Sequence, residues 1–240
     1  MVNYNSKLVT YNTKLMKPYA IIVAGGSGSR MQATIPKQFL LLNGLPVLMH
    51  TIEAFYRSTS QPQIILVLPA DARSYWDELC IQYNFGSPHK IVDGGETRFH
   101  SVKNGLDMIT DTDAVVAIHD AVRPLTSAQI IDNAYKQATE HGNAIVAVKS
   151  RDSIRQVKNE ASVSLLRDEI YLVQTPQTFK LAQLVKAYEQ TYSPKFTDDA
   201  SVVEETGVPI KLIAGDYRNI KITFPEDIAI AELLLRQQPK

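Results

Sequence analysis

A glycine-rich stretch, VAGGSGSRMQATIPKQF (residues 23–39), carries the first residues whose types and spacing could do chemistry. Gly25, Gly26 and Gly28 follow a short apolar run, so their backbone N–H groups could approach phosphate oxygens closely. The planar guanidinium group of Arg30 could donate paired hydrogen bonds to the same anions, and the ammonium group of Lys37 could add a mobile positive charge. The order of residues fits neither G-x-x-x-x-G-K-[ST] nor G-x-G-x-x-G. It predicts a different polyphosphate loop, with a plain surface turn as the alternative.

A second glycine pair opens the segment DGGETRFHSV (residues 93–102). Gly95 stands at the end of an expected strand, where its backbone could face a flat ligand. Arg98 and Ser101 are three residues apart, so they share one face near the start of an expected helix. A glycine turn followed by a solvated helix is the alternative.

The segment AVVAIHDAVRP places charges after five apolar residues and a histidine. Ligands of open α/β sheets bind beyond the carboxyl ends of strands, so Asp120 and Arg123 are site candidates. A capping turn is the alternative. His119 is expected to pack or hydrogen-bond rather than to catalyse.

Three more segments have weaker signals. Thr197 and Asp198 begin a short helix, where an oxyanion site or a simple capping box is expected. Lys221 lies between two isoleucines in an extended stretch and faces away from them, so it could also be plain surface. Ser153 and Arg167 fall in a charged stretch without clear helical spacing.

Apolar strands alternating with amphipathic helices must position these residues. Strands are expected at 19–24, 63–69, 89–95, 114–120, 143–148 and 209–215, and helices at 45–58, 69–83, 96–109, 127–142, 180–192, 197–207 and 225–238. This rhythm predicts an α/β fold: a mostly parallel twisted sheet with helices on both faces. An extended arm is expected at about 150–172. Residues 17–240 are predicted to form one domain behind a flexible tail at 1–16.

Bulk composition narrows the function classes. Lys+Arg and Asp+Glu both number 25, so nothing global favours nucleic acid or a membrane surface. The single cysteine, Cys80, allows no intramolecular disulfide and no cysteine-based metal cluster. No apolar run reaches the roughly 20 residues of a membrane span, and a cytoplasmic protein is expected.

Together these segments resemble nucleotidyltransferases with a Rossmann-like fold, and among them the 2-C-methyl-D-erythritol 4-phosphate cytidylyltransferase family. The resemblance runs from about Tyr19 to Leu235. It rests on the order and spacing of AGGSGSRM, PKQF, VLMHTIEAF, DGGETRFHSV, HDAVRP, RDSIR, QTPQTF, TDDASVVE and NIKIT-PEDI.

The resemblance implies a role for each candidate. Arg30, Lys37 and Lys221 are implied to be catalytic. The nucleotide, CTP, is implied to bind Ala24, Gly25, Gly26, Gly28, Gly95, Glu96, Arg98, Ser101, Asp120 and Ala121. A polyol phosphate is implied to bind Asp120, Arg123, Ser153, Arg167, Thr175 and Thr197. Mg²⁺ near Asp120 and a homodimer whose arms complete the partner's sites are implied as well; the family often has threonine where Ser153 stands.

The expected reaction transfers CMP from CTP to 2-C-methyl-D-erythritol 4-phosphate in the non-mevalonate isoprenoid pathway. Alternatives are a cytidylyltransferase for another polyol phosphate such as ribitol 5-phosphate, a uridylyl-, adenylyl- or guanylyltransferase on a sugar 1-phosphate, and a non-catalytic nucleotide-binding domain.

Overall fold

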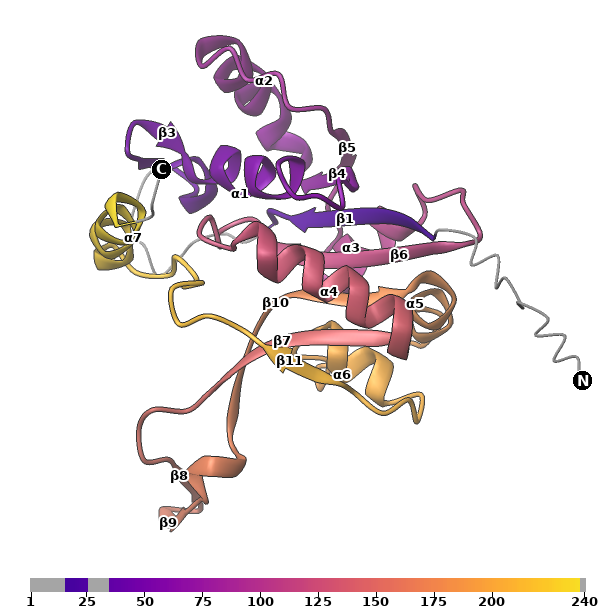
Figure 1. Ribbon diagram of the computed structural model, residues 1–240, viewed down its shortest axis with the longest axis vertical. Coiled ribbons are helices and arrows are strands. Elements are labelled where there is room, and N and C mark those ends of the chain that lie inside the picture. Colours follow the sequence, from indigo (N-terminus) through magenta and orange to yellow (C-terminus); the bar gives the residue numbers. More distant parts are fainter. Residues whose placement is uncertain (1–15, 26–34, 238–240) are drawn as a thin grey trace, which may run out of the picture.

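A seven-stranded sheet forms the centre of the protein in a computed structural model, which describes residues 16–25 and 35–237 (Figure 1). The strand order is β11-β7-β10-β6-β1-β4-β5. These strands are β1 (Lys17–Val23), β4 (Gln63–Leu68), β5 (Lys90–Asp93), β6 (Ala114–Asp120), β7 (Asn143–Lys149), β10 (Tyr171–Lys180) and β11 (Leu212–Ala214). All are parallel except β10, which runs antiparallel to both of its neighbours. The predicted α/β class and mostly parallel sheet are confirmed.

Alternate residues of the central strands pack into two separate hydrophobic cores, one on each face of the sheet. Ala20 and Ile22 pack on one face of the sheet with α1 (Val47–Tyr56), α2 (Arg73–Gln82) and α4 (Ala128–His141). Tyr19 and Ile21 pack on the other face with α3 (Arg98–Leu106), α5 (Leu181–Tyr188) and α6 (Asp199–Glu204). This alternation is what a strand buried on both faces requires.

A third, smaller apolar cluster forms around the C-terminal helix. The C-terminal helix α7 (Glu226–Arg236) packs its Ala231 against a ribbon of β2 (Leu41–Leu42) and β3 (Leu45–Pro46) and against Val122 and Ile222. The cluster joins the segments that carry Lys37 and Lys221. One-turn 3-10 helices, Lys37–Phe39, Ala70–Ala72 and Arg167–Glu169, complete the elements of the described chain.

Helices α4 and α7 begin and end at residues typical of helix termini. Ser127 caps α4 by accepting a hydrogen bond from the Ile130 N–H, and Gly142 ends it with a φ of 98°. Pro225 immediately precedes the first residue of α7. No helix in the described residues is long and apolar enough to cross a membrane.

Strand β10 is the main element that the periodicity missed. The predicted arm ends at about 172 and the next predicted helix begins at 180, yet residues 171–180 form a strand between β6 and β7 in the middle of the sheet. Proline is unfavourable inside a central strand, because it cannot donate to the ladder. The structure accommodates Pro176 at a register shift between Val173 and Gln177, where the regular pairing with β7 is interrupted.

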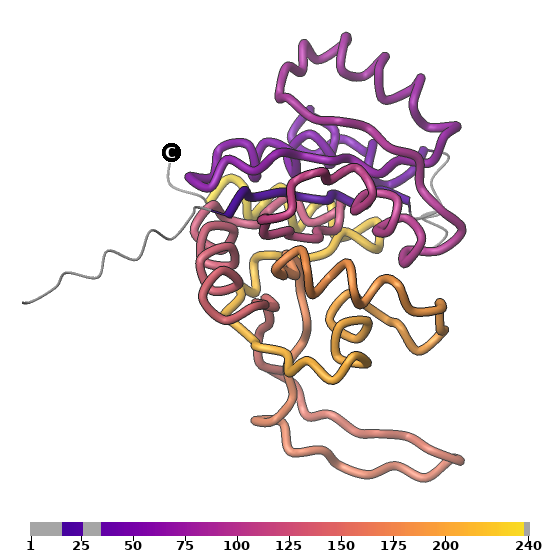
Figure 2. Tube along the Cα trace, turned by 90° about the vertical axis from the view of Figure 1, so that its right-hand side faces the viewer, coloured from indigo at the N-terminus to yellow at the C-terminus, as the bar shows by residue number. Residues whose placement is uncertain are grey.

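A hairpin of β8 (Arg155–Lys158) and β9 (Ala161–Ser164) projects from the body of the sheet (Figures 1 and 2). Every residue of both strands is exposed. The hairpin lies within the predicted arm. The predicted tail at 1–16 lies outside the described residues except for Met16.

Candidate active site

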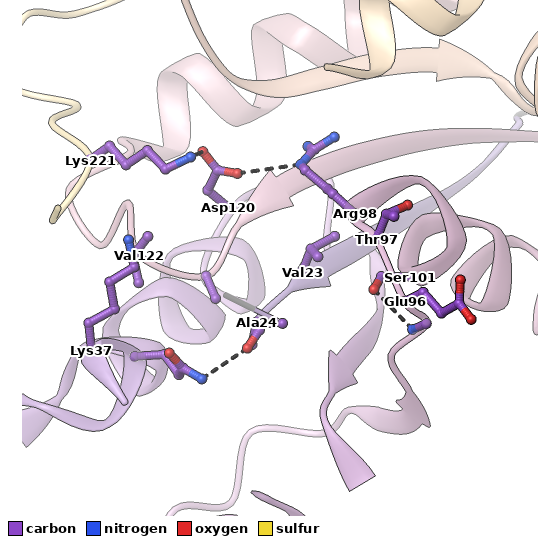
Figure 3. Close-up of a pocket in the computed structure, with 14 residues that line it drawn as sticks. Val23, Ala24, Lys37, Glu96, Thr97, Arg98, Ser101, Asp120, Val122 and Lys221 are labelled. Atoms are coloured by element: carbon purple, nitrogen blue, oxygen red, sulfur yellow. Dashed lines mark hydrogen bonds and ion pairs between the residues drawn. The ribbon is translucent and has the colours of Figure 1, made fainter. Parts of the chain in front are cut away.

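The carboxyl ends of β1, β5 and β6 surround a pocket at the edge of the sheet (Figure 3). Parallel pairing brings these ends together, although they lie far apart in the sequence. Predicted site residues among those that line the pocket are Ala24, Gly25, Lys37, Gly95, Glu96, Arg98, Ser101, Asp120, Ala121 and Lys221.

Backbone hydrogen bonds fix the floor of this first pocket. The Ala24 N–H donates to the Val67 carbonyl at 2.9 Å, and the Ala121 N–H donates to the Val23 carbonyl at 3.1 Å. The buried Gln38 amide donates to the Ala24 carbonyl at 2.9 Å. The strand end is therefore held rigidly just before the glycines. Gly26, Gly28 and Arg30 lie outside the described residues.

The start of α3 forms a second wall. Thr97 caps the helix by accepting a hydrogen bond from the His100 N–H. The Gly95 N–H donates to the Ser101 hydroxyl at 3.1 Å, so the glycine turn and the helix are locked together. A Cβ atom at position 95 would stand 2.4 Å from the His100 Cβ and 3.0 Å from its carbonyl carbon, so glycine is needed here.

Two lysines come to one side of the pocket from distant segments. Lys37 is buried, and its Nζ donates to the Ile222 carbonyl at 3.1 Å. Lys221 precedes Ile222, and its side chain is partly exposed. The side chain of Ile222 is buried in an apolar cluster, which fixes the backbone that follows Lys221 and that accepts the hydrogen bond from Lys37.

The Asp120 carboxylate is surrounded by three cations. Its Oδ2 lies 3.0 Å from Lys221 Nζ, and its Oδ1 lies 3.9 Å from Arg98 Nε (Figure 3). The same Oδ2 also lies 3.2 Å from Arg123 Nε. Burial raises the pKa of the Asp120 carboxyl, but Arg98, Lys221 and Arg123 outweigh burial and hold that pKa well below its usual value. Asp120 is therefore a fixed negative charge and not a proton carrier at neutral pH.

A second pocket adjoins the first and shares Arg98, Asp120 and Lys221 with it. It also contains three predicted acceptor residues, Arg123, Thr175 and Thr197. The Thr175 hydroxyl accepts the Asp120 N–H at 3.1 Å, which ties the antiparallel strand β10 to the end of β6. The shared residues mark the boundary at which groups bound in the two pockets would meet.

The start of α6 does not offer the free amides expected of an oxyanion site. Asp198 caps the helix and forms a capping box with Ser201, as the alternative prediction had it. The Ala200 N–H donates to Gln177 Oε1 at 2.8 Å, and the Ser201 N–H donates to Asp198 Oδ1 at 2.9 Å. The Thr197 side chain, which lines the second pocket, could still contact a ligand here.

Several buried polar residues at the site were missed by sequence reasoning. Asp199, at the start of α6, pairs with Arg98. Asn219 accepts a hydrogen bond from Thr126 at 2.7 Å through its side chain and one from Arg123 at 2.8 Å through its carbonyl. The only sequence signals were the second acid of TDDAS and a polar residue between charges in YRNIK.

Ser153 and Arg167 belong to neither pocket. Both are exposed in the segment of the projecting hairpin, and Arg167 begins a one-turn helix at its base. Within a single chain, the structure does not bring these two residues together with the other acceptor candidates.

His119 is fully buried with its ring against Phe55, and its Nε2 lies 3.3 Å from the Arg123 carbonyl. Burial lowers the pKa of His119 to about 3, so the ring is neutral and structural at physiological pH. Among the described residues, no three histidine, cysteine or acidic side chains form a group that could hold a metal ion. A divalent cation would therefore depend on ligand oxygens, with Asp120 as a protein carboxylate, and Mg²⁺ is commonly held in this way.

Comparisons with known proteins identify relatives of this chain. The family model of 2-C-methyl-D-erythritol 4-phosphate cytidylyltransferase matches residues 19–237. The enzyme of that name from Azobacteroides pseudotrichonymphae is 51% identical over 222 residues, covering 92% of this chain and 100% of the relative.

Solved structures resemble the chain as well. The 4-diphosphocytidyl-2C-methyl-D-erythritol synthase of Anaerococcus prevotii superimposes with a TM-score of 0.79 at 29% identity, covering 92% of this chain and 97% of that one. The 2-C-methyl-D-erythritol 4-phosphate cytidylyltransferase of Francisella tularensis gives 0.74 at 34% identity, with 91% and 99% coverage.

Proposed function

Because the chain belongs to the 2-C-methyl-D-erythritol 4-phosphate cytidylyltransferase family, we infer that it transfers CMP from CTP to 2-C-methyl-D-erythritol 4-phosphate. The products are 4-diphosphocytidyl-2-C-methyl-D-erythritol and pyrophosphate, and the reaction belongs to the non-mevalonate route to isoprenoid precursors. Two adjoining pockets that share Asp120 are the observation that links this function to named residues.

The nucleotide belongs in the first pocket. Its wall of Gly95, Glu96 and Ser101 offers backbone and side-chain groups to the base and ribose, as the family resemblance implies. The triphosphate would extend toward Lys37 and Lys221. Arg30, which lies outside the described residues, is proposed to join them.

The acceptor belongs in the second pocket, where Arg123, Thr175 and Thr197 would hold its phosphate and hydroxyl groups. Lys221 lies between the pockets, so its ammonium group would face the α-phosphate as the two substrates meet. The cations already pair with Asp120, so a bound phosphate would compete with that carboxylate for Lys221.

The chemistry needs no general base from the protein. A phosphate monoester has its second pKa near ~6, so its oxygen is largely ionised at neutral pH. That oxygen forms a bond to the α-phosphorus. The bond from the α-phosphorus to the bridging oxygen breaks, and its electron pair leaves with pyrophosphate. Positioning and charge stabilisation supply the rate, which fits a site built from lysine and arginine.

A divalent cation is proposed to accompany CTP. Mg²⁺ bound to the triphosphate would neutralise part of its charge. Asp120, whose carboxylate stays ionised, is the residue that would contact such an ion, and it would first have to release Lys221.

We further propose a homodimer in which the hairpin reaches the partner's site. The hairpin carries exposed apolar side chains, with Val157 67% and Val163 63% exposed, which a partner would cover. Ser153 and Arg167 lie in this segment, away from the pockets of their own chain, and would complete the partner's acceptor pocket. The cytoplasmic location stays a prediction.

A pyrophosphate-release assay tests the function. CTP, UTP, ATP and GTP are each combined with 2-C-methyl-D-erythritol 4-phosphate and with ribitol 5-phosphate. Release only with CTP and 2-C-methyl-D-erythritol 4-phosphate is expected. Preference for ribitol 5-phosphate would contradict the acceptor assignment, and no release with any pair would indicate a non-catalytic nucleotide-binding protein.

A further inference from the structure

A buried carboxylate lies behind the boundary of the two pockets. Asp199 has no solvent exposure, and its two oxygens receive three hydrogen bonds. Arg98 donates two of them, from NH1 to Oδ1 at 2.8 Å and from NH2 to Oδ2 at 2.7 Å. The Tyr188 hydroxyl donates the third at 2.7 Å. Such a bidentate pair fixes the plane of the guanidinium group as well as its position.

Packing already joins the helices that this ion pair connects. The Phe99 ring of α3 stacks on Tyr188 of α5, with ring centroids 4.6 Å apart and an interplanar angle of 20°. Val202 and Val203 of α6 belong to the same apolar cluster. Burying an ion pair costs desolvation energy and often stabilises no better than apolar side chains. A role in orienting Arg98 accounts for the pair more directly than a role in stability.

Arg98 occupies the place where such an orientation matters. Its side chain is 31% exposed, and it lines both pockets. Its Nε stands 3.9 Å from Asp120 Oδ1, too far for a hydrogen bond. Asp199 therefore holds the guanidinium group beside Asp120 without allowing the two to join. In addition, Asp199 directly follows Thr197 and Asp198, both of which line the second pocket.

We propose that Asp199 is a positioning residue, which holds Arg98 across the boundary of the two pockets so that its remaining N–H groups meet anionic substrate groups. Without Asp199, Arg98 would turn to Asp120 and pair with it directly. The inference rests on the proposed placement of CTP and the acceptor. It assigns Asp199 no contact with either substrate.

Steady-state kinetics of Asp199→Asn in the full chain test the proposal. Asparagine keeps one acceptor oxygen, but its side-chain amide nitrogen would face Arg98 Nη2. Two nitrogen donors cannot bond to each other, so the bidentate pair is lost. We expect KM for both CTP and 2-C-methyl-D-erythritol 4-phosphate to rise at least tenfold, with kcat changed less than threefold. Tyr188→Phe is the matched control, because it removes the third hydrogen bond and leaves the Arg98 pair. It should lower Tm and leave both KM values within twofold.

A double-mutant cycle with Arg98→Gln separates positioning from other roles. If Asp199 acts through Arg98, adding Asp199→Asn to Arg98→Gln changes kcat/KM less than threefold. Should Asp199→Asn fold poorly, Arg98→Lys provides a second route, because a single ammonium cannot form the fork. It should raise both KM values severalfold with Asp199 intact.

Three results would count against the proposal: a lowered Tm with unchanged KM values in Asp199→Asn, additive effects in the cycle, or wild-type KM values in Arg98→Lys. The wild-type assay keeps the two hypotheses distinct. Normal turnover of CTP with additive effects would overturn only the role of Asp199, whereas absent turnover would overturn the proposed function on which that role depends.

Discussion

Replacing Lys221 with methionine should separate its catalytic role from its contribution to stability. Methionine keeps most of the side chain's length and removes the ammonium group that lies 3.0 Å from Asp120 Oδ2. Asp120 would keep Arg123 at 3.2 Å and Arg98 nearby, so its charge would not be left unpaired.

The expected loss of folding stability is small. Two unit charges 3.0 Å apart attract by about 1.4 kcal/mol at the dielectric constant of water. The Lys221 side chain is 41% exposed, so ordering it offsets part of this attraction. Exposed pairs contribute roughly 0.2–1 kcal/mol to the free energy of unfolding. Although Asp120 is buried, Arg123 and Arg98 stay beside it, so we expect a loss near the upper end of this range.

The expected loss of rate is much larger. A donor aimed at charge that develops in the transition state is typically worth ~10²–10³ in kcat, or ~2.7–4 kcal/mol. Lys221→Met should therefore lower kcat in the pyrophosphate-release assay by at least a hundredfold, while urea unfolding shows a loss of no more than about 1 kcal/mol.

Lys17→Met is the matched control. Lys17 forms an ion pair of 2.7 Å with Asp111, and its side chain is 58% exposed. The pair lies at the amino end of β1, away from the carboxyl ends that form the pocket. It should cost a similar amount of stability and leave kcat unchanged. A kcat within threefold of wild type in Lys221→Met, or an equal fall in Lys17→Met, would refute the assignment.

Three further predictions concern the glycine turn, the buried histidine and the hairpin. Gly95→Ala should raise KM for CTP and lower Tm, because the new Cβ would meet His100; unchanged CTP binding by calorimetry would contradict this. His119 has a pKa lowered to about 3, so the unfolded state takes up its proton first as pH falls below about 6.5. The contribution of His119 to the free energy of unfolding is complete above pH 6.5 and is lost toward pH 3, by up to ~1.4 kcal/mol per pH unit. The urea midpoint should therefore fall less between pH 7 and 5 in His119→Leu than in wild type. Equal falls would argue against a buried neutral ring. Val157→Asp combined with Val163→Asp should convert a dimer to monomers in sedimentation velocity, whereas wild-type protein that sediments as a monomer would contradict the proposed dimer.

Local sequence pattern predicted much of the fold because each central strand is a short, continuous apolar run. Residues 114–120 are fully buried, as the run AVVAIHD predicts. The placement of Asp120 and Arg123 followed from one physical rule, that ligands of open parallel sheets bind beyond the strands' carboxyl ends. The rule needs no knowledge of the strand order.

The antiparallel strand β10 could not be predicted in this way. Its first three residues are exposed and its next six are buried, so its composition changes along its length. What places it is pairing with β6 and β7, and such pairing is a long-range property that local periodicity does not encode. Consequently the contact between Thr175 and the backbone of Asp120, 55 residues earlier, was beyond the reach of sequence reasoning.

Charge balance at the site was also hidden in the sequence. Arg98, Arg123 and Lys221 each suggested an anion site, yet in the fold they share Asp120, and Arg98 has a second carboxylate 101 residues away. In the described part of the site, these three cations therefore share two carboxylates, Asp120 and Asp199. Phosphate groups must replace carboxylates as partners of these cations, and the exchange is cheapest for Lys221, the most exposed of the three side chains. Arg123, buried and bonded to the Asn219 carbonyl, is the least free to move. We therefore expect Arg98 and Arg123 to stay in place when substrates bind and Lys221 to move from Asp120 toward the α-phosphate.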